Sequence, residues 1–325
     1  MTLQEIGGYF ELEDYGGSPY HDGTIALDSA RSCLTYLIEL RAIKCISLPD
    51  FMCDAVAEVC TRAGVTLQIY EVRDNFLPAY DFSLGREEWL YLADYYGRLR
   101  DEDVAAAMEF AHGRVVVDEV QGFFRKPWSV ADTIYTCRKY FGVPDGAYLA
   151  TRDGARLDRT LPDGCSAGRV AHLLGRCEER ASSHYNEYLA AEDEVGARGP
   201  EAMSEVTRRL LSGIDYGSVK VRREDNYAIL DGLLGGVNLL ESISPAGPYM
   251  YPLLVDDAGD MRRGLAARGI YIPTLWPNVV EQCSSSSFAY RYANNILPLP
   301  VDQRYGEAEM RHVAKEVGNL LRKKG

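Results

Sequence analysis

The sequence predicts an α/β protein in two parts: a large three-layer domain on a mostly parallel sheet, and a smaller α+β domain at the carboxyl end. Up to about residue 150, stretches with helical periodicity alternate with short apolar, strand-like stretches. Such alternation is typical of parallel strands joined by right-handed crossovers. After about residue 162 the chain turns to long polar helices, and a new strand–helix pattern begins near residue 248. We therefore assign residues 1–235, including those long helices, to the large domain and residues 236–325 to the small one.

Individual elements follow from hydrophobic periodicity and from the residues that begin and end each stretch. Helices are predicted at 31–41, 53–63, 101–111, 169–194, 201–211, 218–234, 258–267 and 307–321. Strands are predicted at 44–48, 66–70, 89–93, 114–117, 133–136, 146–150, 249–255 and near Tyr271.

Composition argues against several classes of protein. The net charge of -13 disfavours a nucleic-acid partner, because a phosphate backbone would be repelled. Residues 1–14 lack the apolar run of a signal peptide, and no stretch of about 18 apolar residues predicts a membrane span. The eight cysteines form no CxxC pair and no zinc-type spacing with histidine, so we expect neither a metal site nor disulfides. Free cysteines are typical of a reducing compartment, and we therefore expect a cytoplasmic location.

One candidate functional residue is Asp118, which directly follows the β-branched run 115–117. Because ligands of open α/β sheets bind beyond the carboxyl ends of the strands, this position places a carboxylate at a binding edge. Taken alone, an aspartate after a strand is more often a turn or helix-capping residue.

A second candidate is Lys139, which follows the predicted strand 133–136 with apolar and aromatic neighbours on both sides. Such surroundings desolvate an ammonium group and lower its pKa, as a lysine that reacts with an aldehyde requires. An isolated lysine of this kind is otherwise a surface residue with a partly buried stem.

A third candidate is the segment 27–34, in which small and polar residues open the first predicted helix. Free backbone N–H groups and the helix dipole make such a turn a phosphate site, although Asp28 or Ser29 also suits a simple N-cap. Together, the three motifs supply a phosphate cradle, a carboxylate for a pyridinium nitrogen and a lysine for an aldehyde. These are the parts that a pyridoxal-phosphate (PLP) enzyme needs.

The same residues resemble the DegT/DnrJ/StrS family of PLP-dependent sugar aminotransferases, from about residue 23 to the last helix. The similar motifs are 29–32 (its phosphate turn), 49–53, 94–97, 118–121 (its Asp-Ala-Ala-Gln) and Lys139 ahead of Gly142. The resemblance implies the PLP transferase fold type I. It also implies a homodimer with shared active sites.

The resemblance further implies roles for individual residues. Lys139 would bind the cofactor's aldehyde and act as the catalytic base, and Asp118 would pair with its ring nitrogen. Gln121 would contact the side of the ring. The phosphate would lie on the turn formed by Ser29, Ala30 and Arg31.

The sequence departs from the family pattern at several positions. Thr136 precedes the lysine by three residues where the family has a Ser or Thr five residues ahead, and it remains a phosphate ligand in this prediction. The ring-stacking aromatic of the family falls on Cys53, with Phe51 as the alternative. The family's Asn-x-Arg motif, which reaches the phosphate bound by the partner subunit, is missing from this sequence. Ser204 and Asn186 are candidates to take over that contact. Tyrosine-rich stretches at 16–21 and 289–294, with Tyr20, His21 and Tyr292, coincide with the family's substrate entrance.

The predicted function is therefore transfer of an amino group from an amino acid, glutamate by resemblance, to a ketone or aldehyde such as a nucleotide-linked keto sugar. Lys139 argues against the related sugar 3-dehydratases, which carry histidine at that position. One alternative is a cysteine-dependent PLP enzyme, similar to a desulfurase, that uses Cys283. Another is a non-catalytic PLP-binding protein. A dinucleotide-dependent dehydrogenase is disfavoured, because no GxGxxG follows the first strand.

Overall fold

The computed structural model describes residues 8–195, 199–256 and 258–322. A seven-stranded sheet of order β1-β7-β6-β5-β4-β2-β3 forms the centre of the larger part. Strand β7 runs antiparallel to both of its neighbours, and the other four pairings are parallel. The strands are β1 (Ile25–Leu27), β2 (Cys45–Pro49), β3 (Thr66–Tyr70), β4 (Trp89–Ala93), β5 (Val115–Asp118), β6 (Asp132–Thr136) and β7 (Ala147–Ala150).

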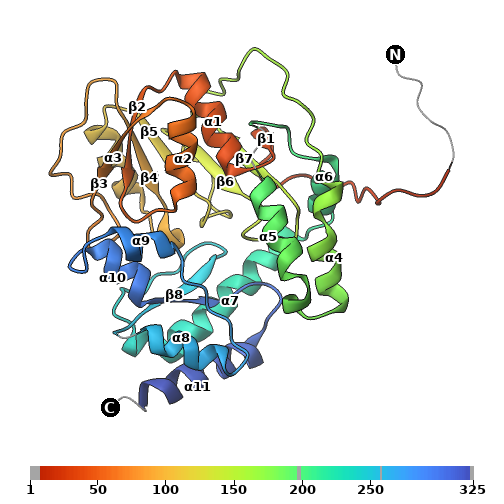
Figure 1. Cartoon of the computed structure of the whole chain (residues 1–325), viewed down its shortest axis with the longest axis vertical. Coiled ribbons are helices and arrows are strands. Elements are labelled where there is room, and N and C mark those ends of the chain that lie inside the picture. Colours follow the sequence, from red (N-terminus) through yellow and green to blue (C-terminus); the bar gives the residue numbers. More distant parts are fainter. Residues whose placement is uncertain (1–7, 196–198, 257, 323–325) are drawn as a thin grey trace.

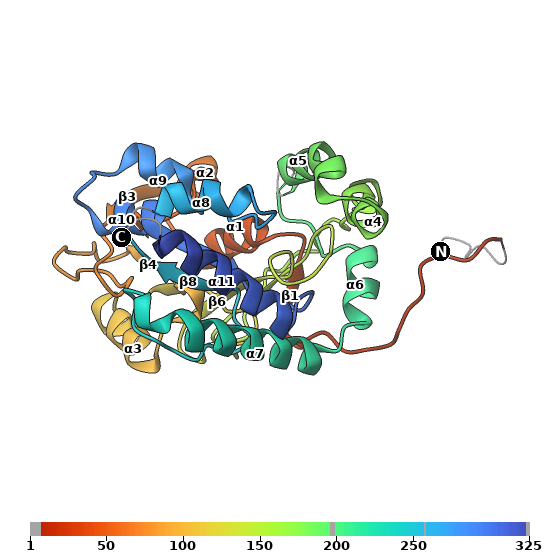
Figure 2. The same cartoon turned by 90° about the horizontal axis from the view of Figure 1, so that it is seen from below.

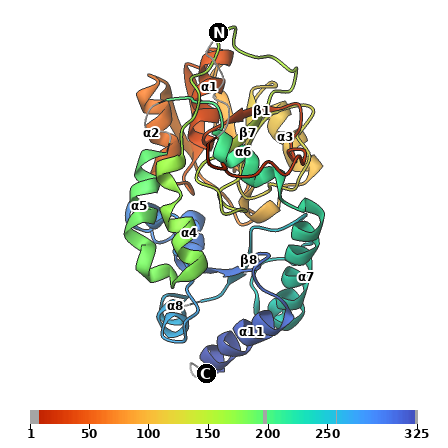
Figure 3. The same cartoon turned by 90° about the vertical axis from the view of Figure 1, so that its right-hand side faces the viewer.

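Helices cover both faces of this sheet. Helices α1 (Ala30–Arg41) and α2 (Asp54–Arg62) lie on one face and α3 (Asp101–Phe110) on the other (Figures 1 and 3). The three central strands β4, β5 and β6 are consequently buried along their whole length. The continuous apolar runs of β4 and of Val115–Val117 in β5, in place of alternating ones, are typical of parallel strands that are covered on both sides. The predicted three-layer, mostly parallel α/β class is confirmed.

A second, smaller unit is built on the antiparallel pair β8 (Met250–Leu254) and β9 (Ile296–Pro300). Helices α7 (Tyr216–Leu234), α8 (Ala258–Ala266) and α11 (Glu307–Arg322) share one core with this pair (Figure 1). Tyr227, Leu230 and Leu234 bring α7 into that core. We propose residue 235 as the boundary between the domains, with α7 as the helix that joins them.

The prediction of one long helix at 169–194 is wrong. The chain forms two shorter helices there. Helix α4 (Ala171–Glu178) and helix α5 (Tyr185–Glu194) are separated by a 3₁₀ turn at Ala181–His184. The break occurs where Glu179 (φ -128°, ψ -179°) and Arg180 adopt extended backbone. Helix α6 (Glu205–Ser212) then begins four residues later than predicted, with Ser204 as its N-cap.

The C-terminal part differs from the prediction at three places. No strand forms near Tyr271, whose side chain is exposed. Helices α9 (Pro277–Gln282) and α10 (Phe288–Asn295) occupy a stretch where no element was predicted. Strand β9 was also missed, because its sequence, ILPLP, contains two prolines, which are rare in strands that are paired on both sides.

Within the described residues, no helix has both the length and the apolar character that a membrane crossing requires.

Candidate active site

One cavity of about 1240 Å³ opens at the carboxyl ends of β4, β5 and β6 and at the N-terminus of α1. This is the edge at which open α/β sheets bind their ligands. All eight predicted site residues line this cavity: Ser29, Ala30, Arg31, Cys53, Asp118, Gln121, Thr136 and Lys139. They are spread over about 110 positions of sequence, so their convergence follows from the sheet topology.

Asp118 ends strand β5 and is buried. One carboxylate oxygen accepts a hydrogen bond from the Tyr91 hydroxyl at 2.8 Å, and the other accepts from the backbone N–H of Val120 at 2.9 Å. Burial raises the pKa of Asp118, and the positive charge of Lys139 opposes that rise. The carboxylate is therefore fixed in direction and available to a cation or a protonated ring nitrogen in the cavity.

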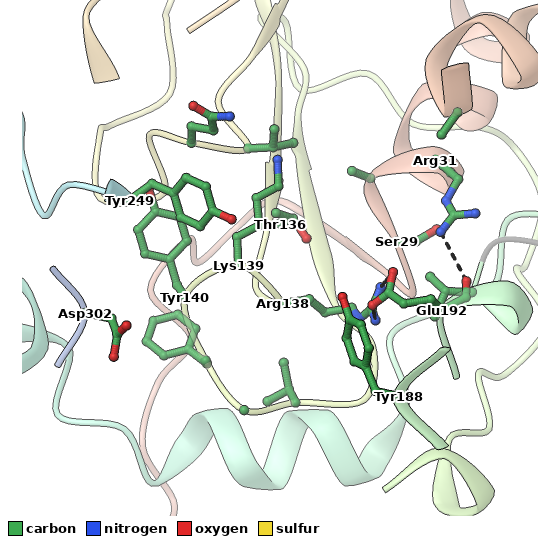
Figure 4. A pocket seen from close by; sticks show the side chains of 18 of the residues that line it. Ser29, Arg31, Thr136, Arg138, Lys139, Tyr140, Tyr188, Glu192, Tyr249 and Asp302 are labelled. Atoms are coloured by element: carbon green, nitrogen blue, oxygen red, sulfur yellow. Dashed lines mark hydrogen bonds and ion pairs between the residues drawn. The ribbon is translucent and has the colours of Figure 1, made fainter. Parts of the chain in front are cut away.

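Lys139 lies in the turn after β6, with its ammonium group 5.5 Å from the ring centre of Tyr249. Figure 4 shows its side chain between Tyr249 and Thr136. No carboxylate of the described residues lies within ion-pair distance of it. Burial lowers the pKa of Lys139, while the nearby charge of Asp118 raises it. The result is an amine with an increased neutral fraction, which is the form that attacks an aldehyde.

The N-terminus of α1 provides hydrogen-bond donors to the same cavity. The side chain of Ser29 caps the helix by accepting from the backbone N–H of Ser32 at 3.1 Å. The N–H groups of Ala30 and Arg31, in the first turn, have no partner within the helix. Thr136, buried at the end of β6, also borders the cavity. An anion placed here meets backbone donors and the positive end of the helix dipole.

Cys53 and Phe51, the two candidates for stacking on a ring, occupy different places. Cys53 is the N-cap position of α2 and lines the cavity. Phe51 is buried in an aromatic cluster, 4.5 Å from the ring of Trp276 and 5.0 Å from that of Tyr95, and does not line it. The geometry therefore favours Cys53 as the side chain at the ring position.

Gln121 is held in place by a specific contact. Its side-chain oxygen accepts a hydrogen bond from the backbone N–H of Tyr96 at 2.8 Å. Tyr96 has a positive φ of 61°, so a tight turn presents this N–H group. The amide nitrogen of Gln121 remains as the donor for a ligand in the cavity.

Three of the residues suggested for the substrate entrance do not line the cavity. Tyr20 donates a hydrogen bond to the backbone oxygen of Phe124, and His21 stacks on Tyr135 with ring centres 3.9 Å apart. Burial lowers the pKa of His21 to about 4. Tyr292 is buried on α10 and stacks on Phe76 at 4.2 Å. These contacts are structural.

The named replacements for the partner's phosphate ligand differ in their surroundings. Ser204 is buried, caps α6 and donates a hydrogen bond to Asp145 at 3.0 Å, so its hydroxyl is already used inside the chain. Asn186 is exposed on α5, and a role for it stays a prediction.

The structure adds residues to which sequence reasoning assigned no role. Tyr91 orients Asp118, Tyr249 covers Lys139, and Arg138 pairs with Glu192 of α5 at the edge of the cavity (Figure 4). A tyrosine inside a fully buried strand was a signal for Tyr91, because its hydroxyl needs a partner. No local signal existed for Tyr249 and Glu192, which arrive from distant parts of the chain.

The donor set of the cavity fits PLP. It contains an amine with a lowered pKa, a buried and oriented carboxylate, and an anion site at a helix N-terminus. These groups match the aldehyde, the ring nitrogen and the phosphate of that cofactor.

Comparison with known proteins gives agreement in structure alone. No family model matches the sequence, and no curated protein matches it. The sugar aminotransferase CalS13 from Micromonospora echinospora superposes with a TM-score of 0.65 at 17% identity, covering 91% of this chain and 86% of that one. DesV from S. venezuelae, solved in complex with a ketimine intermediate, gives 0.64 at 18% identity over 93% and 85% of the two chains. A DegT DnrJ EryC1 StrS aminotransferase from Brucella abortus gives 0.62 at 14% identity over 91% and 85%. The chain therefore has the predicted PLP transferase fold type I.

Proposed function

We propose that this protein is a PLP-dependent aminotransferase. The observation that carries the proposal is that Asp118 and Lys139, at the ends of adjacent parallel strands, face one cavity together with the N-terminus of α1. The solved structures with this fold include the sugar aminotransferase CalS13, which supports the same reaction class here.

In this proposal each side chain has a defined task. When bound, the cofactor supplies an aldehyde that takes up amino groups and a ring that withdraws electrons. The Asp118 carboxylate holds the proton of the ring nitrogen. The Lys139 amine moves a proton at the substrate carbon that carries the amino group. Ser29, Thr136 and the first N–H groups of α1 bind the phosphate, and Gln121 donates to the side of the ring.

The size of the cavity supports a large acceptor. About 1240 Å³ exceeds the roughly 300–1,000 Å³ of an ordinary small-molecule site. Tyr140, Tyr249 and Trp276 supply aromatic surface on its walls. We propose a nucleotide-linked keto sugar as the acceptor and glutamate as the donor.

The cysteine-dependent alternative has no structural support. Cys283 does not line the cavity, and burial raises the pKa of its thiol, so the reactive thiolate is disfavoured.

Two further assignments belong to the proposal. A homodimer fits the N-terminal arm, on which Tyr9 and Phe10 are 98% and 97% exposed and which runs away from the body (Figures 1 and 2). A reducing cytoplasm fits the eight cysteines, all of which are free.

The test of the central proposal is covalent capture of the cofactor. The protein is incubated with PLP and dialysed, and we expect an absorbance band on the order of 400 nm. Reduction with borohydride then fixes the added mass on the peptide that contains Lys139. Lys139→Ala loses both signals, whereas Lys44→Ala, at an exposed lysine, keeps them. A wild-type protein that stays colourless and unmodified would refute the proposal.

The reaction class is tested separately. Glutamate added to the loaded protein should abolish the band and release 2-oxoglutarate, and cysteine should release no sulfide. Sulfide release without reaction of glutamate would favour the cysteine-dependent alternative.

A further inference from the structure

Two arginine side chains converge on one residue at the edge of the cavity. The guanidinium of Arg138 forms an ion pair with the carboxylate of Glu192, and a second N–H group of Arg138 lies 3.4 Å from the other carboxylate oxygen. Arg31 donates to the backbone oxygen of Glu192 at 3.4 Å. Figure 4 shows Glu192 reaching in from α5 to meet both arginines beside Ser29.

This cluster lies at the phosphate end of the candidate site. Arg138, Glu192, Arg31, Ser29 and Thr136 all line the same cavity. The side chains of Arg138 and Glu192 are only 16% and 33% exposed, so their charges are partly withdrawn from water. The carboxylate of Glu192 also acts on Lys139, whose pKa it raises. The carboxylate of Glu192 thus lies next to the expected position of the phosphate.

We propose that Arg138 is the arginine that binds the cofactor's phosphate, and that Glu192 occupies Arg138 until the phosphate displaces it. This inference rests on the proposed function. It means that the chain supplies the cationic phosphate ligand itself, from the position directly before Lys139.

The physical reason for the exchange is charge and geometry. A phosphate monoester carries about -1.5 to -2 charges at neutral pH and three acceptor oxygens, against one charge on a carboxylate. The planar guanidinium group binds such an anion through two parallel N–H donors. Phosphate therefore outcompetes Glu192, provided that Glu192 can move away.

Helices α4 and α5 allow that movement. Ala191 is the one buried residue of α5, and α4 has none. A helix pair with so few buried apolar side chains opens at a small cost in free energy.

Two other arginines of the cavity, Arg223 and Arg304, are occupied by contacts that a phosphate would have to break. Arg223 is buried and donates to the backbone oxygens of Pro248 and Tyr140. Arg304 forms a two-point contact with Asp302, on a separate loop that follows β9. Arg138 differs, because its partner is a side chain on a loosely packed helix.

The test uses ligands that bind without the aldehyde, so that Lys139 does not contribute. Isothermal titration of the full chain measures dissociation constants for pyridoxine 5′-phosphate and for pyridoxine. The variants are Arg138→Met, Arg138→Lys, Glu192→Gln and the pair Arg138→Met with Glu192→Gln. Arg176→Met, at an exposed arginine of α4 that also lines the cavity, is the matched control.

We expect Arg138→Met to weaken binding of the phosphate ester roughly tenfold to hundredfold and to leave pyridoxine unchanged. The affinity of Arg138→Lys for the phosphate ester should lie between that of Arg138→Met and that of the wild type. Glu192→Gln should strengthen binding of the ester, and this gain should vanish in the double variant. Arg176→Met should leave both dissociation constants unchanged.

The inference would be overturned if Arg138→Met bound the ester as tightly as the wild type does. It would also be overturned if Arg138→Met lost as much affinity for pyridoxine as for the ester. Weaker ester binding by Glu192→Gln would overturn it too. If borohydride fixes PLP on Lys139 while Arg138→Met has no effect, this inference fails and the proposed function stands. If ester binding depends on Arg138 but no PLP is fixed, the aminotransferase proposal fails and the phosphate site stands.

Discussion

Asp118 and Lys139 have pKa values that one cause, burial, shifts in opposite directions. Burial disfavours the charged form of each group, which raises the pKa of Asp118 and lowers that of Lys139. Each charge moderates the shift of the other. A carboxyl group and an amine whose charged forms are both disfavoured by burial thus share one cavity, a combination that is typical of functional sites.

The residue-scale prediction concerns Asp118→Asn. We expect the variant to fold and to fix PLP on Lys139, because the amide keeps the shape of the carboxylate and its contact with Tyr91. Its rate of reaction with glutamate should fall about 10²–10³-fold, the range found when one preorganised electrostatic contact is removed. Stopped-flow loss of the absorbance band measures this rate. An unchanged rate would show that Asp118 does not serve the ring nitrogen.

At the scale of elements, the connection between β6 and β7 organises the site. Gly146, just before β7, has a φ of +113°, and its N–H donates to the backbone oxygen of Asp28 at 2.6 Å. Its own backbone oxygen accepts from the N–H of Cys137 at 2.9 Å. The loop that carries Lys139 is thereby joined to the segment that begins α1.

The element-scale prediction compares two Gly→Ala substitutions. In Gly146→Ala the new Cβ would lie 2.9 Å from the Thr207 methyl carbon at a φ that alanine rarely adopts. We expect a loss of about 1–3 kcal/mol in the free energy of unfolding. In Gly232→Ala, on an exposed helical position of α7 with open space, we expect a gain of about 0.5–1 kcal/mol.

Urea denaturation followed by circular dichroism measures both changes. An unchanged free energy of unfolding in Gly146→Ala would show that the turn at Gly146 accommodates the new methyl group without cost. A destabilising Gly232→Ala would show that helix propensity does not determine the effect at that site.

At the scale of the whole molecule, two buried acidic residues form a pair: Asp94, which lines the cavity, and Glu119. Burial, with the nearby charge of Asp94, raises the pKa of Glu119 well above its usual 4.5. The indole N–H of Trp128 donates to Glu119 at 2.6 Å, and Arg125 lies 3.5 Å from the same oxygen. The folded protein therefore keeps a proton on this pair at a pH where the unfolded chain has lost it.

The sign of the resulting pH dependence follows from that raised pKa. The stability that protonated Glu119 contributes is fully present below pH 4.5, which is its pKa in the unfolded chain. This contribution is lost as the pH rises through the higher pKa of Glu119 in the folded protein. We predict that the free energy of unfolding decreases as the pH rises above 4.5, and that Glu119→Gln flattens this decrease. Glu109→Gln, at an exposed position of α3, should leave the profile unchanged. Denaturant titrations across this pH range check the prediction, and identical slopes for wild type and Glu119→Gln would contradict it.

The proposed dimer is also a whole-molecule property. We expect light scattering to give twice the chain mass of 36.2 kDa. The double substitution Tyr9→Ser and Phe10→Ser should weaken the dimer, because nearly all of these two aromatic surfaces is exposed in the single chain. A wild-type mass of one chain would refute the dimer, and an unaffected double variant would exclude the arm from its interface.

Much of the site was predictable because its signals are local. Asp118 ends an apolar run, Lys139 follows a strand, and Ser29 precedes a helical period, so each position is determined by its neighbours in sequence. The alternation of strands and helices then places all three at one edge of a parallel sheet.

The errors arose where local signals were short or interrupted. The three-residue β1 and the proline-containing β9 are too brief or too irregular for a periodic pattern. The predicted helix 169–194 has helical residues on both sides of its break, and nothing in composition marks Glu179 as the point where the backbone becomes extended.

The sequence by itself determined the fold class and the positions of Asp118, Lys139 and the α1 turn, because hydrophobic period and turn chemistry act over a few residues. The tertiary structure alone decided that Cys53 and not Phe51 faces the cavity, and that Glu192 meets Arg138 across 54 positions. Such pairings depend on how whole helices pack against the sheet. No short stretch of sequence encodes that packing, since the contacts form only when distant segments bury their apolar faces together.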